Sequence, residues 1–324
     1  MKVLVVGGAG YIGSNTAYEL ARLGHEVVVL DNLSTGRRKN IGQSMRFYEG
    51  DIRNRADIAQ VLAAEQAMSP IDLVMHFAAK LIVEESMSYP LAYYHNNIEG
   101  LRMLMEVMLD FGIRRLVFSS TAAVYGQPES AVCREDDPTR PINPYGETKL
   151  ADEKMIQWVA AAHGLQYCIL RYFNVAGAGA GLTLGLDKDQ LTHLIPLIMQ
   201  TALGLRDKFY IYGSDYDTPD GTCIRDYIHV TDLALAHIAG AEYLLGGDRS
   251  IIANLGSGTG YSVRQVLDQA LELFDVPYEY AERRAGDPAC LIADISRARN
   301  ELGWQPQLGL RDIIESDYQF RSRL

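Results

Sequence analysis

Residues 2–13 decide the fold, and they read Lys2-Val3-Leu4-Val5-Val6-Gly7-Gly8-Ala9-Gly10-Tyr11-Ile12-Gly13. The opening residues are mostly apolar and predict a short strand that is buried on both faces. Three glycines follow at the spacing Gly7-x-x-Gly10-x-x-Gly13, directly before a helical stretch that runs to about Leu23. Such glycines permit a tight turn and a close backbone approach, and the N-terminus of the helix offers its amides to a pyrophosphate. The stretch therefore predicts a dinucleotide site between the first strand and the first helix.

The alternation of apolar strands and helices continues to about residue 172. We expect further strands at 26–30, around Phe47, and at 72–77, 116–118 and 166–171, with helices at 54–67, 90–110 and 145–162. Unbroken apolar strands that alternate with helices indicate a parallel sheet covered on both faces. The predicted fold class is α/β, a doubly wound parallel sheet of the Rossmann type.

The rhythm then changes, with loops rich in Gly, Asp and Thr at 177–187 and 213–222. We expect a dinucleotide-binding domain over 1–172 and a smaller C-terminal α/β substrate lobe over 173–324. The two domains are expected to be interleaved. An apolar stretch near 251–254 reads as a strand that returns to the first sheet, which places a returning segment near 230–256.

The composition limits the classes of protein that the chain can belong to. Its 324 residues are 48% hydrophobic and carry a net charge of −11, which is ordinary for a soluble globular protein and argues against general nucleic-acid binding. No stretch approaches the ~18 apolar residues that a spanning helix needs, so we expect no membrane span and a cytoplasmic location. The four Cys lie far apart without a metal-ligand spacing to the His residues, and no metal site is expected.

The second predicted strand ends at Asp31, 18 residues after Gly13. A carboxylate at this position can accept hydrogen bonds from both hydroxyls of an adenosine ribose, and it would repel a 2′-phosphate. Asp31 therefore favours NAD over NADP. The neighbouring cations Arg37, Arg38 and Lys39 weaken the inference, because enzymes that use NADP employ a nearby cation.

Two further groups follow predicted strands, where ligands bind in this architecture. Asp51-Ile52 comes after the third strand, and Phe77-Ala78-Ala79 comes after the fourth. The small residues at 78 and 79 would let a cofactor approach the backbone. Asp51 has an alternative role as a helix cap, with Asn54 nearby.

The candidate catalytic pair is Tyr145 and Lys149. The reference pKa of a Tyr is about 10, which makes it a poor base at neutral pH. A cation four residues later on a helix lies over the same face and favours the phenolate, so the Tyr can exchange protons near neutral pH. Thr121 closes a Ser119-Ser120-Thr121 run after the fifth predicted strand and supplies a hydroxyl.

Longer runs accompany these motifs: Gly7 to Ser14, Tyr93-Tyr94-His95-Asn96-Asn97, Phe118 to Gly126, Arg171-Tyr172-Phe173-Asn174, Arg225-Asp226-Tyr227-Ile228-His229-Val230 and Arg283-Arg284-Ala285-Gly286-Asp287. With them the chain resembles the extended short-chain dehydrogenase/reductases and, within these, the family of UDP-glucose 4-epimerases. The resemblance extends from residue 2 to about residue 305.

The resemblance implies a reversible epimerisation at C4 of a UDP-hexose. Hydride would pass transiently to tightly bound NAD, through a 4-keto sugar. Tyr145 would take the proton from the sugar 4-hydroxyl, and Lys149 would lower the pKa of Tyr145 and hold the nicotinamide ribose. The Thr121 hydroxyl would bond the same 4-oxygen.

The resemblance also implies two sets of binding residues. The cofactor set is Gly7, Gly10, Tyr11, Ile12, Gly13, Asp31, Asn32, Asp51, Ile52, Phe77, Ala78, Ala79, Asn96, Ser119, Tyr145, Lys149, Tyr172 and Phe173. The substrate set is Thr121, Tyr145, Asn174, Leu194, Tyr212, Arg225, Tyr227, Arg284, Asp287 and Leu291. Arg225 and Arg284 would clamp the diphosphate, since a guanidinium fork suits phosphate oxygens. Surface or interdomain ion pairing is their alternative role.

Several alternatives stay open. Leu291 lies where a larger Tyr would exclude an N-acetyl group, so UDP-N-acetylhexosamines or UDP-uronates are possible substrates. A 4,6-dehydratase needs an acid and a base directly after Thr121, and Ala122 and Ala123 can transfer no proton. A nucleotide-sugar reductase or decarboxylase on the same scaffold is the next rival. A dinucleotide sensor that has lost catalysis would not need Thr121, Tyr145 and Lys149 together.

The predicted helices at 90–110 and 146–162 carry apolar residues on more than one face, including Met103, Val107, Met155 and Trp158. One face must cover the sheet. The resemblance implies that the other face pairs with a second subunit, as a homodimer built around a four-helix bundle. The alternative is burial under the second lobe.

Overall fold

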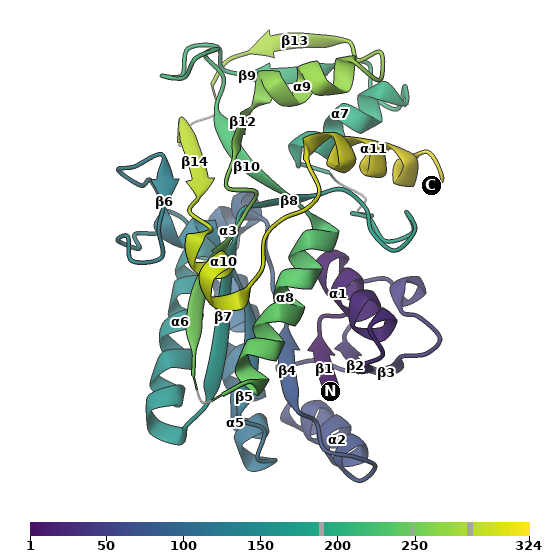
Figure 1. Ribbon diagram of the computed structural model, residues 1–324, viewed down its shortest axis with the longest axis vertical. Helices are drawn as coiled ribbons and strands as arrows, with labels where there is room; N and C mark the ends of the chain where they lie inside the picture. The colour runs from purple at the N-terminus through teal and green to yellow at the C-terminus, as the bar shows by residue number, and fades with distance from the viewer. Residues whose placement is uncertain (188–190, 248, 284–287) are drawn as a thin grey trace.

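A seven-stranded parallel sheet forms the centre of the larger lobe (Figure 1). The computed structural model describes residues 1–187, 191–247, 249–283 and 288–324. The strand order is β11-β7-β5-β4-β1-β2-β3, and every neighbouring pair is parallel. The bounds are β1 Lys2–Val6, β2 Glu26–Asp31, β3 Arg46–Glu49, β4 Leu73–His76, β5 Arg115–Thr121, β7 Gln166–Tyr172 and β11 Ile251–Leu255. The doubly wound α/β class predicted from the sequence is confirmed.

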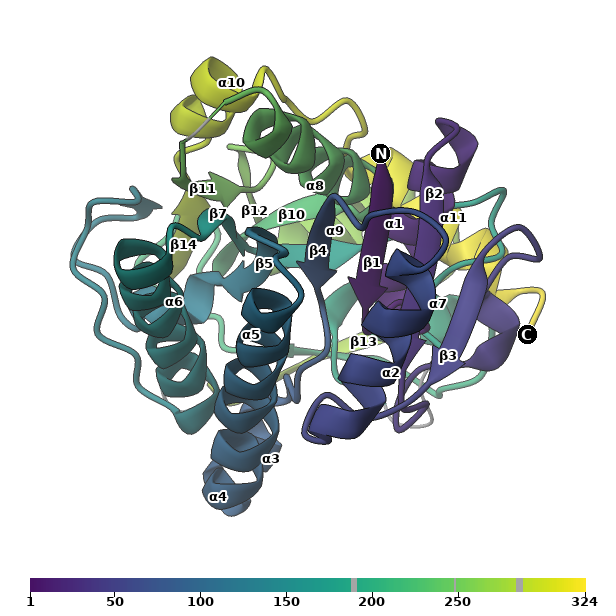
Figure 2. The same ribbon diagram turned by 90° about the horizontal axis from the view of Figure 1, so that it is seen from below.

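Helices cover both faces of this sheet (Figure 2). One layer contains α1 Tyr11–Arg22, α8 Val230–Leu245 and α10 Ser296–Leu302; the other contains α2 Arg55–Gln66, α5 Gly100–Asp110 and α6 Pro144–His163. In β1, Val3 and Val5 lie in the core beneath the first layer, whereas Leu4 and Val6 lie in the core beneath the second. Both sides of the strand are therefore shielded from solvent, which explains its unbroken apolar run.

The helical region before β5 is more complex than the single helix expected over 90–110. The chain is helical over that range, but its middle is a π-helical segment, Tyr94–Glu99, between α4 Pro90–Tyr93 and α5. A short helix that the sequence did not indicate, α3 Val83–Ser88, comes before it. Pro90 begins α4 because a missing N–H costs nothing in the first turn of a helix.

The smaller lobe lies at the carboxyl ends of the large sheet and is built around β10 (Figure 1). Its five-stranded sheet has the order β12-β10-β14-β6, with β8 also paired to β10, and a separate ribbon pairs β9 with β13. The strands are β6 Val132–Cys133, β8 Asn174–Ala176, β9 Phe209–Tyr212, β10 Ile224–His229, β12 Gly260–Ser262, β13 Tyr278–Ala281 and β14 Cys290–Ala293. The helices are α7 Leu194–Ala202, α9 Val263–Leu271 and α11 Leu310–Arg321, with short 3₁₀ turns at Arg38–Asn40 and Ala122–Tyr125 elsewhere in the chain.

β10 joins the two lobes directly. It ends at His229, and α8 begins at the next residue and packs on the large sheet. The chain then enters β11, where Ile251 pairs with Cys168 of β7. The apolar stretch near 251–254 thus lies in the large sheet. Strand β10 is consequently anchored to the same framework as the glycine-rich turn.

A buried ion pair ties α6 to the sheet. Two guanidinium nitrogens of Arg171, in β7, lie 2.7 and 3.0 Å from Glu153 oxygens, and both side chains are almost fully buried. Ser120 of β5 donates a further hydrogen bond to Glu153. Because each charge has lost its water, each depends on the other for compensation.

We expect Arg171→Met to lower the free energy of unfolding by about 3–5 kcal/mol, because Glu153 is left buried without its partner. The double variant Glu153→Gln/Arg171→Met should recover part of this loss, since the uncompensated charge is removed. Urea denaturation measures both. The control is Arg311→Met, which breaks an exposed pair with Glu315 and should change stability little. Equal losses in the single and double variants would contradict the assignment.

Candidate active site

The glycine-rich turn between β1 and α1 is shaped by close backbone contacts. Gly7 has a φ of +79°, and a Cβ atom there would lie 2.5 Å from the backbone nitrogen of Ala78. A Cβ at Gly13 would lie 2.3 Å from the carbonyl oxygen of Gly7. Gly10 is the N-cap of α1. Because glycine has no side chain, the N-cap offers no side-chain acceptor to the first amides of the helix. The turn is therefore open to an anionic ligand and closed to larger residues.

Asp31 lies at the end of β2 beside this turn. Its carboxylate accepts hydrogen bonds from the backbone nitrogens of Ala9 at 2.9 Å and Leu33 at 2.8 Å. Burial raises the pKa of Asp31, and these two hydrogen bonds oppose that shift. Two of the cations that weakened the NAD inference have partners elsewhere: Arg38 lies over the Phe47 ring at 4.5 Å, and Lys39 pairs with Asp187 at 2.9 Å.

Asp51 and Asn32 meet at the ends of β3 and β2. The Asn32 amide donates to Asp51 at 3.0 Å, and Arg53 forms an ion pair with the same carboxylate. The Arg53 guanidinium holds the pKa of Asp51 well below its usual range. Asn54 caps α2 by accepting from the Ala56 nitrogen, so the helix-cap alternative for Asp51 is wrong. The neighbouring Ile52 is buried in the core.

The residues that follow β4 lie next to the glycine-rich turn. Phe77 donates its backbone N–H to Val6 at 2.8 Å, which aligns the exits of β4 and β1. The Phe77 ring lies 4.7 Å from the ring of His237 in α8. Ala78 and Ala79 follow and are only partly buried. Ala78 and Ala79 have only methyl side chains, so they place little bulk beside the glycine-rich turn.

Thr121, Tyr145 and Lys149 come together where β5 meets α6. Thr121 is the last residue of β5, and Tyr145 lies in the first turn of α6, which Asn143 caps by accepting from the Gly146 nitrogen. The Thr121 side chain is hydrogen-bonded to the Tyr145 phenol. Lys149 is buried and donates from Nζ to the Ser119 carbonyl at 2.8 Å.

The ionisation of this group differs from the prediction. Burial raises the pKa of Tyr145 to about 12, the Thr121 hydrogen bond acts in the opposite direction, and the charge of Asp152 raises it further. The net direction is thus opposite to the lowering expected from Lys149, whose ammonium donates to the Ser119 carbonyl and lies 4.4 Å over the Phe118 ring. Burial also lowers the pKa of Lys149.

The other residues of the predicted cofactor set make separate contacts of different kinds. The hydroxyls of Ser119 and Tyr172 are hydrogen-bonded to each other, and Phe173 is buried beside them in the chain. Asn96 lies in the π-helical segment and donates to Asn97. The Tyr11 hydroxyl donates to the Gly177 carbonyl at 2.6 Å, so its side chain links the turn to the second lobe. Ile12 packs against the core beneath the sheet.

Four residues of the predicted substrate set lie in the sheet around β10. Tyr227 pairs with Asn174 of β8, and Arg225 pairs with Leu291 of β14. Arg225 donates to the Pro288 carbonyl at 2.7 Å. Leu194 begins α7 and Tyr212 ends β9, so neither lies in this sheet. Arg284 and Asp287 lie outside the described residues.

One residue of the site region was missed. The buried side chain of Asn97 accepts from the Lys80 nitrogen at 2.9 Å and donates to the Lys80 carbonyl and to Thr148 of α6. It fixes the loop after β4 against the catalytic helix. An Asn-Asn pair inside an otherwise good helix was the available signal, since Asn disfavours helix interiors unless its side chain has a partner.

The donor set fits a dinucleotide: uncapped helix amides, a carboxylate at the end of β2 and a turn where only glycine fits. The model of the NAD dependent epimerase/dehydratase family matches residues 3–256. The chain belongs to this family. Among its members, UDP-glucose 4-epimerase of Lacticaseibacillus casei is 49% identical over 323 residues, covering 99% of this chain and 96% of the relative.

Solved structures of family members agree with the described fold. The UDP-glucose 4-epimerase of Stenotrophomonas maltophila, with bound NAD and formylated UDP-arabinopyranose, is 39% identical with a TM-score of 0.96, covering 100% of this chain and 98% of the other. The UDP-Glc/GlcNAc 4-epimerase of Campylobacter jejuni is 42% identical with a TM-score of 0.87, covering 100% and 99%. The family resemblance seen in the sequence is confirmed. Among the described residues of this chain, no helix is long and apolar enough to cross a membrane, and no cluster of potential metal ligands is found.

We expect Gly7→Ala to lower the free energy of unfolding by more than the about 1–2 kcal/mol that a left-handed backbone costs a non-glycine residue. The added methyl would also clash with Ala78. The matched control is Gly24→Ala, which has a φ of +83° but open space around the new Cβ, and should show the backbone cost alone. Urea denaturation compares the two. Equal losses would mean that the contact with Ala78 imposes no constraint.

Proposed function

We propose that this protein catalyses the reversible epimerisation at C4 of UDP-hexoses, with UDP-glucose and UDP-galactose as the principal pair. The observation that carries the proposal is the meeting of Thr121, Tyr145 and Lys149 at the carboxyl end of β5. This edge of the sheet also holds the glycine-rich turn. A cytoplasmic location accompanies the proposal.

We further propose a division of labour between the domains. Residues 1–172 would hold NAD, and 173–324 would hold the nucleotide-sugar, with the segment near 230–256 returning to the first domain. The amides of α1 would receive the pyrophosphate, and Asp31 the adenosine ribose. NAD held by these residues would supply the hydride acceptor and donor that the reaction at C4 of the sugar requires.

The chain's own residues handle the proton. Tyr145 takes it from the 4-hydroxyl, which requires a phenolate, and the Thr121 hydroxyl favours that form by its hydrogen bond. The Lys149 ammonium provides the positive charge of the site and holds the nicotinamide ribose. Once the 4-keto sugar has turned over in the pocket, Tyr145 gives the same proton back to the 4-oxygen. No net proton or electron leaves the protein.

The residues after Thr121 separate this reaction from a dehydratase reaction. Ala122 and Ala123 begin a 3₁₀ turn, and the Ala123 nitrogen donates to the Thr121 hydroxyl at 3.1 Å. Neither methyl side chain can protonate a leaving hydroxyl or remove a proton from C5. The 4-keto sugar therefore has no route to elimination and returns to a hexose.

Leu291 bears on which sugars enter. It lies in β14 opposite Arg225 and packs against the apolar cluster that includes Phe173 and Ala122. A leucine occupies less depth than a tyrosine, so the wall that it forms leaves room for a 2-substituent. We propose that UDP-N-acetylhexosamines enter this site besides UDP-glucose and UDP-galactose.

The purified protein should interconvert UDP-glucose and UDP-galactose without added reductant, and Tyr145→Phe should lower kcat by about 10²–10⁴-fold, the usual worth of a positioned acid–base group. Chromatography of a panel of UDP-sugars, including UDP-N-acetylglucosamine, measures both the reaction and the 2-substituent. Tyr18→Phe, on the exposed side of α1, is the control and should retain full activity. Stoichiometric formation of NADH without an epimer would instead indicate a net dehydrogenase.

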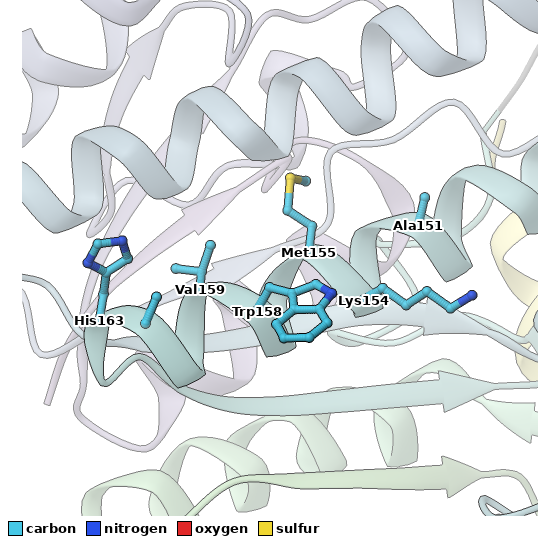
Figure 3. Close-up of a pocket in the computed structure, with 7 residues that line it drawn as sticks. Ala151, Lys154, Met155, Trp158, Val159 and His163 are labelled. Atoms are coloured by element: carbon cyan, nitrogen blue, oxygen red, sulfur yellow. The ribbon is translucent and has the colours of Figure 1, made fainter.

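We also propose that the chain forms a homodimer through a four-helix bundle. The outer face of α6 carries a hollow lined by Ala151, Lys154, Met155, Trp158, Val159, Ala162 and His163 (Figure 3). Trp158 is 76% exposed, and on the neighbouring helical stretch Leu91 is 82% exposed. Large apolar side chains in these positions favour contact with a second copy. Burial under the second lobe does not occur for Trp158.

The mass in solution should be about twice the 36.0 kDa of one chain. We expect Trp158→Asp to shift the protein towards the monomer, because a charge would have to be buried at the interface. Light scattering after size exclusion measures both masses. Met68→Asp, at an exposed apolar position beyond the end of α2, should leave the mass unchanged. A monomeric mass for the unmodified protein would overturn the proposal.

A further inference from the structure

Asp152 is a buried carboxylate on the inner face of α6 that the proposed mechanism does not use. It follows Lys149 by three residues and Tyr145 by seven. Seven residues make almost two full turns, so Asp152 lies behind Tyr145 on the same side of the helix, about 10 Å along its axis. Only 1% of the Asp152 residue is exposed, against 2% for Lys149.

Among the residues that the structure describes, neither carboxylate oxygen of Asp152 has a hydrogen-bond partner. A buried carboxylate in such a position costs several kcal/mol unless a charge compensates it. A merely structural acid would be expected to accept hydrogen bonds, as Asp226 does from the nitrogens of Ser257, Gly258 and Ala293. Burial raises the pKa of the Asp152 carboxyl, and the charge of Lys149 opposes that shift, so Lys149 is the cation that favours an ionised Asp152.

The adjacent carboxylate, Glu153, also favours the charged form of Lys149, but less than Asp152 does. Its charge is compensated by the Arg171 guanidinium, and Ser120 donates to it as well. Lys149 donates only to a neutral carbonyl in the described contacts, that of Ser119. Asp152 is thus the carboxylate near Lys149 whose charge no guanidinium cancels.

Among the described residues, the other titratable groups named here that pack near this part of α6 are either neutral or already paired. His76 in β4 stays neutral because burial lowers its pKa to about 3. Tyr93 in α4 donates to the Ile82 carbonyl and to Glu85 of α3, which in turn pairs with Lys80. Tyr125, in the 3₁₀ turn after β5, donates to Asn254. α5 buries only apolar side chains and Gly100.

We propose that Asp152 is a positioning residue of the active site: its carboxylate is the counter-ion that keeps Lys149 charged beside Tyr145. The inference rests on the proposed function and deepens it. Burial lowers the pKa of Lys149, and the Asp152 charge opposes that shift. The same charge raises the pKa of Tyr145. Asp152 therefore favours the protonated Lys149 that the reaction needs, and it raises the pH at which Tyr145 loses its proton.

Asp152→Asn removes the charge and keeps the shape, so both pKa values should fall by about one pH unit. The pH profile of kcat should keep its height while its acid limb, from Tyr145, and its alkaline limb, from Lys149, both move to lower pH. Asp152→Ser is a second variant in case the amide packs poorly. Glu147→Gln removes an exposed carboxylate from the same helix and should leave both limbs in place.

A readout that does not need turnover is the ¹³C resonance of the Lys149 Cε in lysine-labelled protein, assigned by its absence from Lys149→Met. Its titration should move to lower pH in Asp152→Asn and stay unchanged in Glu147→Gln. A lower rate with unmoved limbs and an unmoved Lys149 titration would reduce Asp152 to a structural role and overturn the inference. Absence of epimerisation in the unmodified protein would contradict the proposed function instead. The Lys149 titration would still test whether Asp152 is the counter-ion of Lys149.

Discussion

A single buried cation imposes the strongest constraint on this structure. Lys149 is removed from water and offers its ammonium to one backbone carbonyl, at Ser119. The desolvation of an ammonium costs several kcal/mol, which one neutral hydrogen bond does not offset. The Phe118 ring below the ammonium contributes, since the face of an aromatic ring attracts a cation. The remainder must come from negative charge nearby, and α6 supplies it from its own inner face.

This requirement spreads through the fold. The two carboxylates that follow Lys149 on α6, Asp152 and Glu153, are themselves buried, and each raises the pKa of Lys149. Glu153 then needs Arg171, which ties α6 to β7, and Arg171 also donates to the Tyr125 hydroxyl at 3.0 Å. The catalytic helix is therefore held by charges as well as by apolar packing. Such a network is costly to assemble, but removal of one member leaves another uncompensated, so the geometry around Tyr145 is sharply defined.

The sequence predicted those parts of the molecule that depend on local patterns. Gly7, the unbroken apolar run of β1 and Asp31 at the end of β2 could be placed because backbone sterics and strand polarity fix their roles. The π-helical segment and α3 could not be predicted, since both depend on contacts such as that of Asn97 with Lys80 across 17 residues. The sign of the Tyr145 shift was missed for a related reason. Helical spacing places a cation near the phenol, but it does not show that Lys149 is buried and that Tyr145 is partly buried.

The two faces of α6 show why one helix can serve chemistry and assembly together. Its inner face carries Tyr145, Lys149 and Asp152, and its outer face carries Met155 and Trp158. Helical spacing keeps these sets apart, yet it places them within a few turns of each other. A contact on the outer face would stabilise the helix whose inner face holds the buried Lys149 and Asp152. Stability gained from such a contact would offset part of the cost of burying ions on the inner face, which is a physical reason to expect the proposed subunit contact to be coupled to the site.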